Sequence, residues 1–162
     1  MMQNILKGKG LWLDAKYSVR MVDVWTPMFD LSNHEKCLRK TSGAEKHIDK
    51  VAEMVVSRKA GNYDRLSLVH WLAKWYYRTY ENQRRTRHFL VMKDRCTGCG
   101  LCARQCPEHA IECRDGHPVW VKEKCTLCLK CLHHCPRFAI QYGRHTINHG
   151  QFVYPAKPGS GK

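Results

Sequence analysis

The chain has 162 residues, and its 28 lysines and arginines against 14 aspartates and glutamates give a formal net charge of +14. Its length suits one domain or two small ones, and no apolar run approaches the roughly 18 residues that cross a membrane. The first ten residues lack the apolar stretch of a secretory signal. We therefore expect a reducing, cytoplasmic compartment, which argues against a disulfide scaffold.

Residues 1–33 show no sustained periodicity. Short alternating apolar stretches between residues 10 and 22 predict one or two strands. Residues 25–27 and 30–33, which are rich in Pro, Asp, Ser and Asn, predict loops.

Residues 34–88 are predicted to form a helical hairpin that acts as a linker or adaptor. The first helix should begin at Ser42, which forms a capping-box pattern with Glu45, and end before Gly61 at its C′ position. The second should run from about residue 64 to residue 82. Helical spacing predicts one apolar face on each helix: Ile48, Val51, Ala52, Val55 and Val56 on the first, and Leu68, Val69, Leu72, Trp75 and Tyr76 on the second.

The hairpin ends in a polar, basic stretch, residues 81–88, which predicts a solvated connector and a domain boundary. Its arginines, Arg84, Arg85 and Arg87, could contact phosphate. Nucleic-acid binding is therefore one alternative, and it is the least favoured because such runs are usually solvated.

The C-terminal half contains one cysteine pattern twice, with the copies 29 residues apart. The first copy reads CTGCGLCARQCP from Cys96, and the second reads CTLCLKCLHHCP from Cys125. Both follow C-x2-C-x2-C-x3-C-P, the spacing that binds [4Fe–4S] clusters. A structural zinc site is the main alternative, but zinc ribbons use two separated cysteine pairs. The sequence therefore predicts two [4Fe–4S] clusters.

Three cysteines at this spacing can surround one face of a cluster, whereas the fourth lies beyond the loop in a helix. With two-fold related repeats, the fourth cysteine should reach the cluster of the other repeat. The predicted ligands are Cys96, Cys99, Cys102 and Cys135 for the first cluster, and Cys125, Cys128, Cys131 and Cys106 for the second.

Several neighbours of these cysteines differ between the repeats or lie outside the pattern. Leu127 and Leu129 replace Gly98 and Gly100, so the surroundings of the two clusters should differ. Cys113 is expected to be a small, buried strand residue, and Cys37 has no predicted role. The remaining expectations are an exposed histidine pair and two aromatic residues that either shield the clusters or belong to the core: His133, His134, Trp120 and Tyr142.

From residue 95 to about residue 154 the chain resembles the bacterial-type 2[4Fe–4S] ferredoxins. The resemblance implies an α+β fold in which residues 89–145 form a ferredoxin-like β-α-β-β-α-β module with internal pseudo-two-fold symmetry. The helical region precedes this module, and a tail of residues 146–162 follows it. The Asp115-Gly116 pair predicts the turn between the two middle strands.

The sequence from Cys125 to Gly143 is similar to the ferredoxin module of flavodoxin–ferredoxin fusion proteins of anaerobic bacteria. Residues 21–32, MVDVWTPMFDLS, are similar to the middle of those fusions. The resemblance implies that residues 1–33 are the remnant of a flavodoxin-like domain whose larger part is missing. FMN is not expected, because no Ser/Thr/Gly-rich phosphate loop occurs near the start of the chain.

The leading hypothesis is a soluble electron carrier that is not itself an enzyme. The alternative is an electron-transfer subunit of a larger oxidoreductase. Two clusters with eight thiolates would leave a net charge of about +10, so the expected partner is an acidic or flavin-containing redox protein. The oligomeric state is left open.

Overall fold

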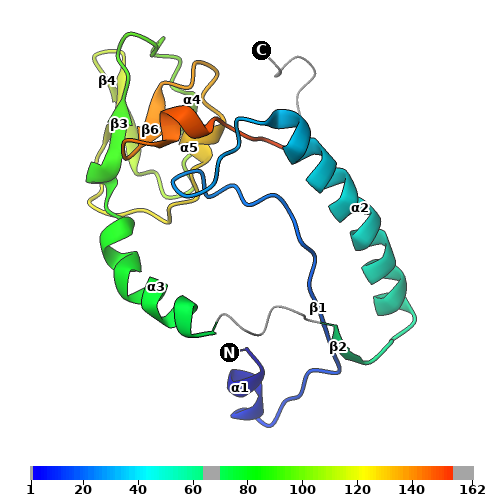
Figure 1. Ribbon diagram of the computed structural model, residues 1–162. Helices are drawn as coiled ribbons and strands as arrows, with labels where there is room; N and C mark the ends of the chain where they lie inside the picture. The colour runs from blue at the N-terminus through cyan, green and yellow to red at the C-terminus, as the bar shows by residue number, and fades with distance from the viewer. Residues whose placement is uncertain (1, 64–69, 155–162) are drawn as a thin grey trace. The chain divides into compact units, whose positions relative to one another are not determined.

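The computed structural model describes residues 2–63 and 70–154 and divides into two compact units (Figure 1). The first unit comprises residues 1–22 and 39–73, and the second comprises residues 23–38 and 74–162. Helices and short two-stranded sheets are mixed along the chain, which is compatible with the α+β class. Within the described ranges, none of the helices has both the length and the apolar character needed to span a bilayer.

The first unit contains α1 (Met2–Lys7) and a parallel pair of strands, β1 (Ala15–Tyr17) and β2 (Gly61–Tyr63). The rings of Tyr17 and Tyr63 stack with their centroids 5.2 Å apart, and the Tyr17 hydroxyl donates to the Lys59 carbonyl. Of the one or two strands predicted between residues 10 and 22, one is present, as β1. The sequence did not predict α1 or β2.

The long helix α2 (His34–Val56) begins in the second unit and continues in the first. The predicted start at Ser42 is wrong, because the Asn33 side chain accepts a hydrogen bond from the Lys36 amide (2.9 Å) and caps the helix nine residues earlier. The prediction that Gly61 is the C′ residue of this helix is also wrong. Arg58, with φ 51°, takes the left-handed conformation, and Lys59 donates to the Met54 carbonyl as in a Schellman motif.

The apolar stripe predicted on the first helix is largely exposed. Ile48, Val55 and Val56 are 43, 56 and 83% exposed, so they add little to a core in this unit. β2 interrupts the connection to the next helix, where the sequence predicted a short turn. Two residues of the second predicted stripe, Leu68 and Val69, lie outside the described residues.

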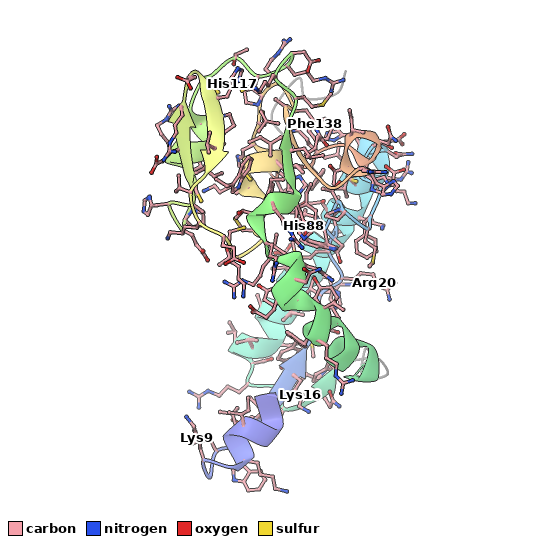
Figure 2. The ribbon with its side chains drawn as sticks, turned by 90° about the vertical axis from the view of Figure 1, so that its left-hand side faces the viewer. Lys9, Lys16, Arg20, His88, His117 and Phe138 are labelled. Atoms are coloured by element: carbon pink, nitrogen blue, oxygen red, sulfur yellow. The ribbon has the colours of Figure 1, made fainter. Side chains whose placement is uncertain are left out.

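The second unit contains the cysteine repeats. After α3 (His70–Gln83) come η2 (Thr86–His88), β3 (Phe89–Val91), α4 (Leu101–Arg104), β4 (Ile111–Arg114), β5 (His117–Trp120), α5 (Lys130–His133), β6 (Ile140–Tyr142) and α6 (Thr146–His149). β3 pairs antiparallel with β6, and β4 pairs antiparallel with β5. Asp115 and Gly116, with φ 49° and 74°, form the predicted turn just before His117 (Figure 2).

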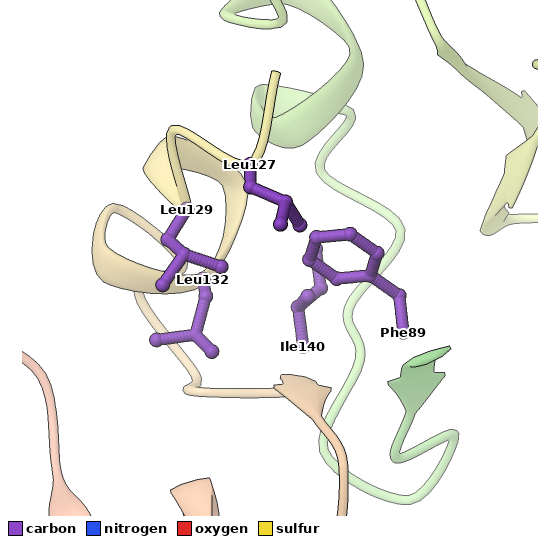
Figure 3. Packing of buried hydrophobic residues seen from close by; sticks show 5 residues of the cluster. All are labelled: Phe89, Leu127, Leu129, Leu132 and Ile140. Atoms are coloured by element: carbon purple, nitrogen blue, oxygen red, sulfur yellow. The ribbon is translucent and has the colours of Figure 1, made fainter. Parts of the chain in front are cut away.

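The core of this unit is built mostly from the second repeat, together with Phe89 of β3 (Figure 3). Leu127, Leu129, Leu132, Ile140 and Phe89 are all less than 10% exposed and point toward one another. The Phe89 ring stacks on Trp120 with centroids 4.9 Å apart and meets Tyr142 edge-on at 5.1 Å. These ring contacts place Trp120 and Tyr142 against the core. Full burial of each aliphatic side chain stabilises the fold by about 1.5–3 kcal/mol.

The basic stretch before β3 is not the solvated connector that was predicted. Arg84 and Cys125 are joined twice, since the Cys125 amide donates to the Arg84 carbonyl (2.9 Å) and Arg84 Nε donates to the Cys125 carbonyl (3.2 Å). The Thr86 amide donates to the Glu123 carbonyl at 2.8 Å. Residues 84–86 thus pack on the loop of the second repeat, although the sequence predicted a boundary at residue 88.

His133, which was expected to be exposed, is buried beneath residues 23–31. One ring nitrogen, Nε2, donates to the Val24 carbonyl (2.9 Å), and Nδ1 accepts from the Phe152 amide (3.3 Å). Burial lowers the pKa of His133, so the ring is neutral and can satisfy both partners. A second contact holds residues 23–31 in place: the Leu31 amide donates a hydrogen bond to the His149 carbonyl at 2.7 Å.

We expect His133→Ala to destabilise the second unit. The substitution leaves the Val24 carbonyl and the Phe152 amide without their partner, which costs about 1–3 kcal/mol. Anaerobic denaturant unfolding should show a lower midpoint than the unsubstituted protein. His145→Ala, at an exposed histidine, is the control. Equal midpoints for the two variants would contradict the bridging role of His133.

Candidate metal centre

One cavity of the second unit is lined by thiols from both repeats. Cys96, Cys99 and Cys102 come from the loop before α4 and its first turn, and Cys135 comes from the segment after α5. Apolar residues such as Pro118 and Ile140 form part of the remaining lining, together with Cys113 and Arg137. The structure therefore brings together the four cysteines predicted for the first cluster.

A second cavity has the reciprocal composition. Cys125, Cys128 and Cys131 come from the loop before α5 and its helix, and Cys106 comes from the segment after α4. Phe89 and Trp120 form part of its wall, together with Leu129. Each cavity thus collects three of the predicted ligands from one repeat and the fourth from the other. The assignment of these thiols as ligands stays a prediction, because lining a cavity is not coordination.

The fourth cysteine of each repeat is held in the same way. The Ala110 amide donates to Cys106 Sγ, and the Ala139 amide donates to Cys135 Sγ, both at 3.3 Å. Hydrogen bonds of this kind orient a ligand and adjust the charge on its sulfur. The two remote thiols therefore have matching backbone environments.

The cysteine loops share their backbone conformation despite different residues. Gly98 and Gly100 have φ 67° and 70°, and their counterparts Leu127 and Leu129 have φ 54° and 53°. The left-handed conformation costs a leucine about 1–2 kcal/mol, and full burial of its side chain contributes about 1.5–3 kcal/mol. The core around Leu127 and Leu129 thus offsets the strain of their backbone.

In the first cysteine loop, a leucine could not take the place of Gly98. A Cβ atom on Gly98 would lie 2.6 Å from the Gly116 carbonyl oxygen, so the β4–β5 turn leaves no room for a side chain. The predicted difference between the repeats is therefore a difference of side chains on a common backbone. Glycine permits close packing of the turn in one repeat, and leucine builds the core in the other.

Three of the thiols that line the cavities, those of Cys102, Cys125 and Cys131, are difficult to ionise in the absence of a bound cation. Burial raises the pKa of Cys102 to about 11, and the nearby Cys113 thiol adds to the effect. Burial also raises the pKa values of Cys125 and Cys131. Thiolates are the metal ligands, so loading must release protons and stabilise the surrounding fold.

The arrangement of the thiols suits a cluster better than a single ion. Among residues 2–63 and 70–154, no three His, Cys, Asp or Glu side chains are placed to hold one metal ion. A zinc ion would need four ligands converging on a point about 2.3 Å from each sulfur. A cubane binds each thiolate through a separate iron, so its ligands stand around a larger core. Four thiols around an apolar cavity therefore fit a [4Fe–4S] cluster.

Residues outside the cysteine pattern also border the cavities. Cys113, on β4, lines the first cavity and is exposed, so the prediction of a buried strand residue is wrong. Arg137 lines the same cavity and was not identified from the sequence. Cys37 is buried away from both cavities, with its sulfur 4.0 Å from the Leu31 carbonyl oxygen.

Residues 88–136 match the model of a protein family, the 4Fe-4S dicluster domain. No curated protein and no solved structure matches the chain. The match covers both cysteine loops and supports an iron–sulfur protein of ferredoxin type with a function in electron transfer. It also agrees with the thiol-lined cavities described above.

Proposed function

We propose that this protein is a one-electron carrier that holds two [4Fe–4S] clusters, one in each thiol-lined cavity. The first would be bound by Cys96, Cys99, Cys102 and Cys135, and the second by Cys106, Cys125, Cys128 and Cys131. The clusters supply the redox chemistry. The chain's own residues bind them, orient the thiols through the Ala110 and Ala139 amides, and exclude water with the Phe89–Trp120 stack.

One observation carries the proposal: each of the two cavities is lined by the four thiols predicted for one cluster, three from one repeat and one from the other. The cysteine spacing and the family match support the same chemistry. Free thiols at these positions also suit the reducing environment of the cytoplasm.

Anaerobic purification followed by iron and sulfide analysis tests the proposal. We expect about eight irons and eight inorganic sulfides per chain, since each cubane contains four of each. Reduction should produce the EPR signal of [4Fe–4S]1+ centres. Stoichiometric zinc without sulfide would show that the cavities are structural metal sites.

The alternative function is an electron-transfer subunit of a larger oxidoreductase. It is favoured by the exposed apolar residues of α2, Ile48, Val55 and Val56, which a partner subunit could cover. Size-exclusion chromatography of the native protein under anaerobic conditions distinguishes the two. A free carrier elutes at the mass of a single chain or a simple oligomer of it, and a subunit elutes with other polypeptides.

The relation to flavodoxin–ferredoxin fusions depends on the residues that carry the resemblance, chiefly 21–32 and 125–143. We propose that residues 1–33 descend from a flavodoxin-like domain and that the chain binds no flavin. The flavin content of the purified protein is its direct test.

A further inference from the structure

The first cavity contains one thiol more than the four that a cubane binds. Cys113, on β4, lines it together with Cys96, Cys99, Cys102 and Cys135. The second cavity is lined by its four predicted ligands and, among the residues that the structure describes, by no further cysteine. The two cavities therefore differ in the number of sulfur atoms that a cluster could bind.

One pair of facing strand residues accounts for this difference. Cys113 pairs with Pro118 between β4 and β5, and Tyr142 pairs with Phe89 between β3 and β6. The offset of 29 residues between the repeats relates Cys113 to Tyr142 and Phe89 to Pro118. Tyr142 does not line the second cavity, because its hydroxyl donates to the Gln83 carbonyl and its ring meets Phe89 edge-on. In the first repeat smaller residues stand at both positions, and one of them is a thiol.

The Cys113 sulfur lies next to the first cysteine loop. A Cβ atom on Gly100 would be 3.6 Å from Cys113 Sγ, and Gly100 stands between the predicted ligands Cys99 and Cys102. After burial, the Cys113 thiol is the largest cause of the raised pKa of Cys102, ahead of Cys135. Both observations indicate that Cys113 is a neighbour of Cys102.

Cys113 is also accessible from solvent. It is a free, exposed cysteine, whereas Cys37, the other cysteine outside the repeated pattern, is only 5% exposed. In the cluster-loaded protein the eight cysteines of the pattern would bind iron. Cys113 would then be the thiol that a reagent reaches first, so alkylation reports whether it is bound or free.

We propose that Cys113 is a reserve ligand of the first cavity, which binds the cluster in place of Cys102 when the Cys102 thiolate is lost. The inference rests on the proposed function and deepens it, because the first cluster gains a second possible ligand set: Cys96, Cys99, Cys113 and Cys135. Cys135 approaches from the other repeat, so Cys113 does not replace it.

The exchange replaces one bond to iron by another. Cys113 Sγ forms a bond to the iron that Cys102 Sγ no longer holds, and the Cys113 thiol gives its proton to water as it binds. The number of thiolate ligands and the charge of the site stay the same, and no electron is transferred. The second cavity has no equivalent exchange, because Tyr142 occupies the corresponding position.

Four forms of the protein, loaded with iron and sulfide under anaerobic conditions, test the reserve ligand. They are the wild type, Cys102→Ala, Cys102→Ala with Cys113→Ala, and Cys131→Ala. Cys131 corresponds to Cys102 in the second repeat, so Cys131→Ala is the matched control. The wild type and Cys102→Ala should each contain about eight irons and eight sulfides, and the other two forms about half as much.

Alkylation by iodoacetamide, followed by peptide mass spectrometry, identifies the ligand directly. The reaction is carried out anaerobically on the folded, loaded proteins. In the wild type Cys113 should react, because it is free and exposed. In Cys102→Ala its rate of alkylation should fall about ten-fold or more, since a thiol bound to iron is no longer available as a nucleophile.

The proposal is overturned if Cys102→Ala contains no more iron than the double variant, or if its Cys113 reacts at the wild-type rate. The EPR signal of a three-iron cluster in oxidised Cys102→Ala would also overturn it, because one iron site would then lack a ligand. Should Cys102→Ala fail to fold, Cys102→Ser takes its place, and protection of Cys113 from alkylation is again the expected result. Wild-type protein without iron and sulfide would refute the proposed function as well, whereas a fully loaded wild type beside a half-loaded Cys102→Ala refutes the reserve ligand alone.

Discussion

Cys106→Ala is expected to remove the cluster of the other repeat and leave the cluster of its own loop in place. Cys106 lines the cavity of Cys125, Cys128 and Cys131, so its loss leaves that cavity with three thiols. Cys135→Ala should have the reciprocal effect at the cavity of Cys96. Each variant should retain about half of the iron and sulfide, with one set of EPR signals missing.

Cys113→Ala is the matched control, since Cys113 lines the first cavity without belonging to the predicted ligands. It should retain the full iron and sulfide content. The crossed assignment is wrong if Cys106→Ala disturbs the EPR signals of the first loop's cluster and spares those of the second. Loss of both clusters in every ligand variant would mean that the two cavities fold and load as one cooperative unit.

The second large effect is expected for Gly98→Ala. The new Cβ atom would lie 2.6 Å from the Gly116 carbonyl oxygen, at a residue whose φ of 67° already disfavours a side chain. Steric overlap and left-handed strain together should lower the free energy of unfolding by about 2–4 kcal/mol. The measurement is the midpoint of anaerobic denaturant unfolding, together with the rate at which the protein releases iron.

Gly143→Ala isolates the contribution of strain. Gly143 has nearly the same φ, 64°, but nothing lies within 4 Å of the added Cβ atom. Its loss should therefore be about 1–2 kcal/mol. A Gly98→Ala variant no less stable than Gly143→Ala would show that the β4–β5 turn moves away at little cost, and that its contact with the first cysteine loop does not constrain the fold.

Local patterns predicted the parts of the fold that depend on nearby residues. The predicted Asp115-Gly116 turn is present, and Ala15–Tyr17 is one of the one or two strands predicted between residues 10 and 22. The start of α2 was missed because the Ser42–Glu45 pattern matches a capping box, whereas the Asn33 cap is followed at its third helical position by Lys36. A capping pattern in the sequence does not show whether a residue earlier in the chain already caps the same helix.

Residues whose contacts are distant in sequence could not be predicted. His133 was expected on the surface because α5 offers no sign that residues 23–31 cover it, and Arg84 was expected in solvent because nothing near it indicates Cys125 as a partner. The exposure of Cys113 likewise follows from its strand's position at the cavity, and a strand propensity contains no such information. In each case the missing information was a long-range contact.

The cysteine spacing alone predicts the chemistry and the grouping of the thiols, because a repeated local pattern places donor atoms at repeated positions. The tertiary structure adds what surrounds each group. It packs Leu127 and Leu129 into the core of one repeat, places Gly98 against a turn in the other, and covers the second repeat with residues 23–31 and 84–86. Such contacts join positions up to 109 residues apart. They depend on how the whole chain packs, and no local pattern contains that information.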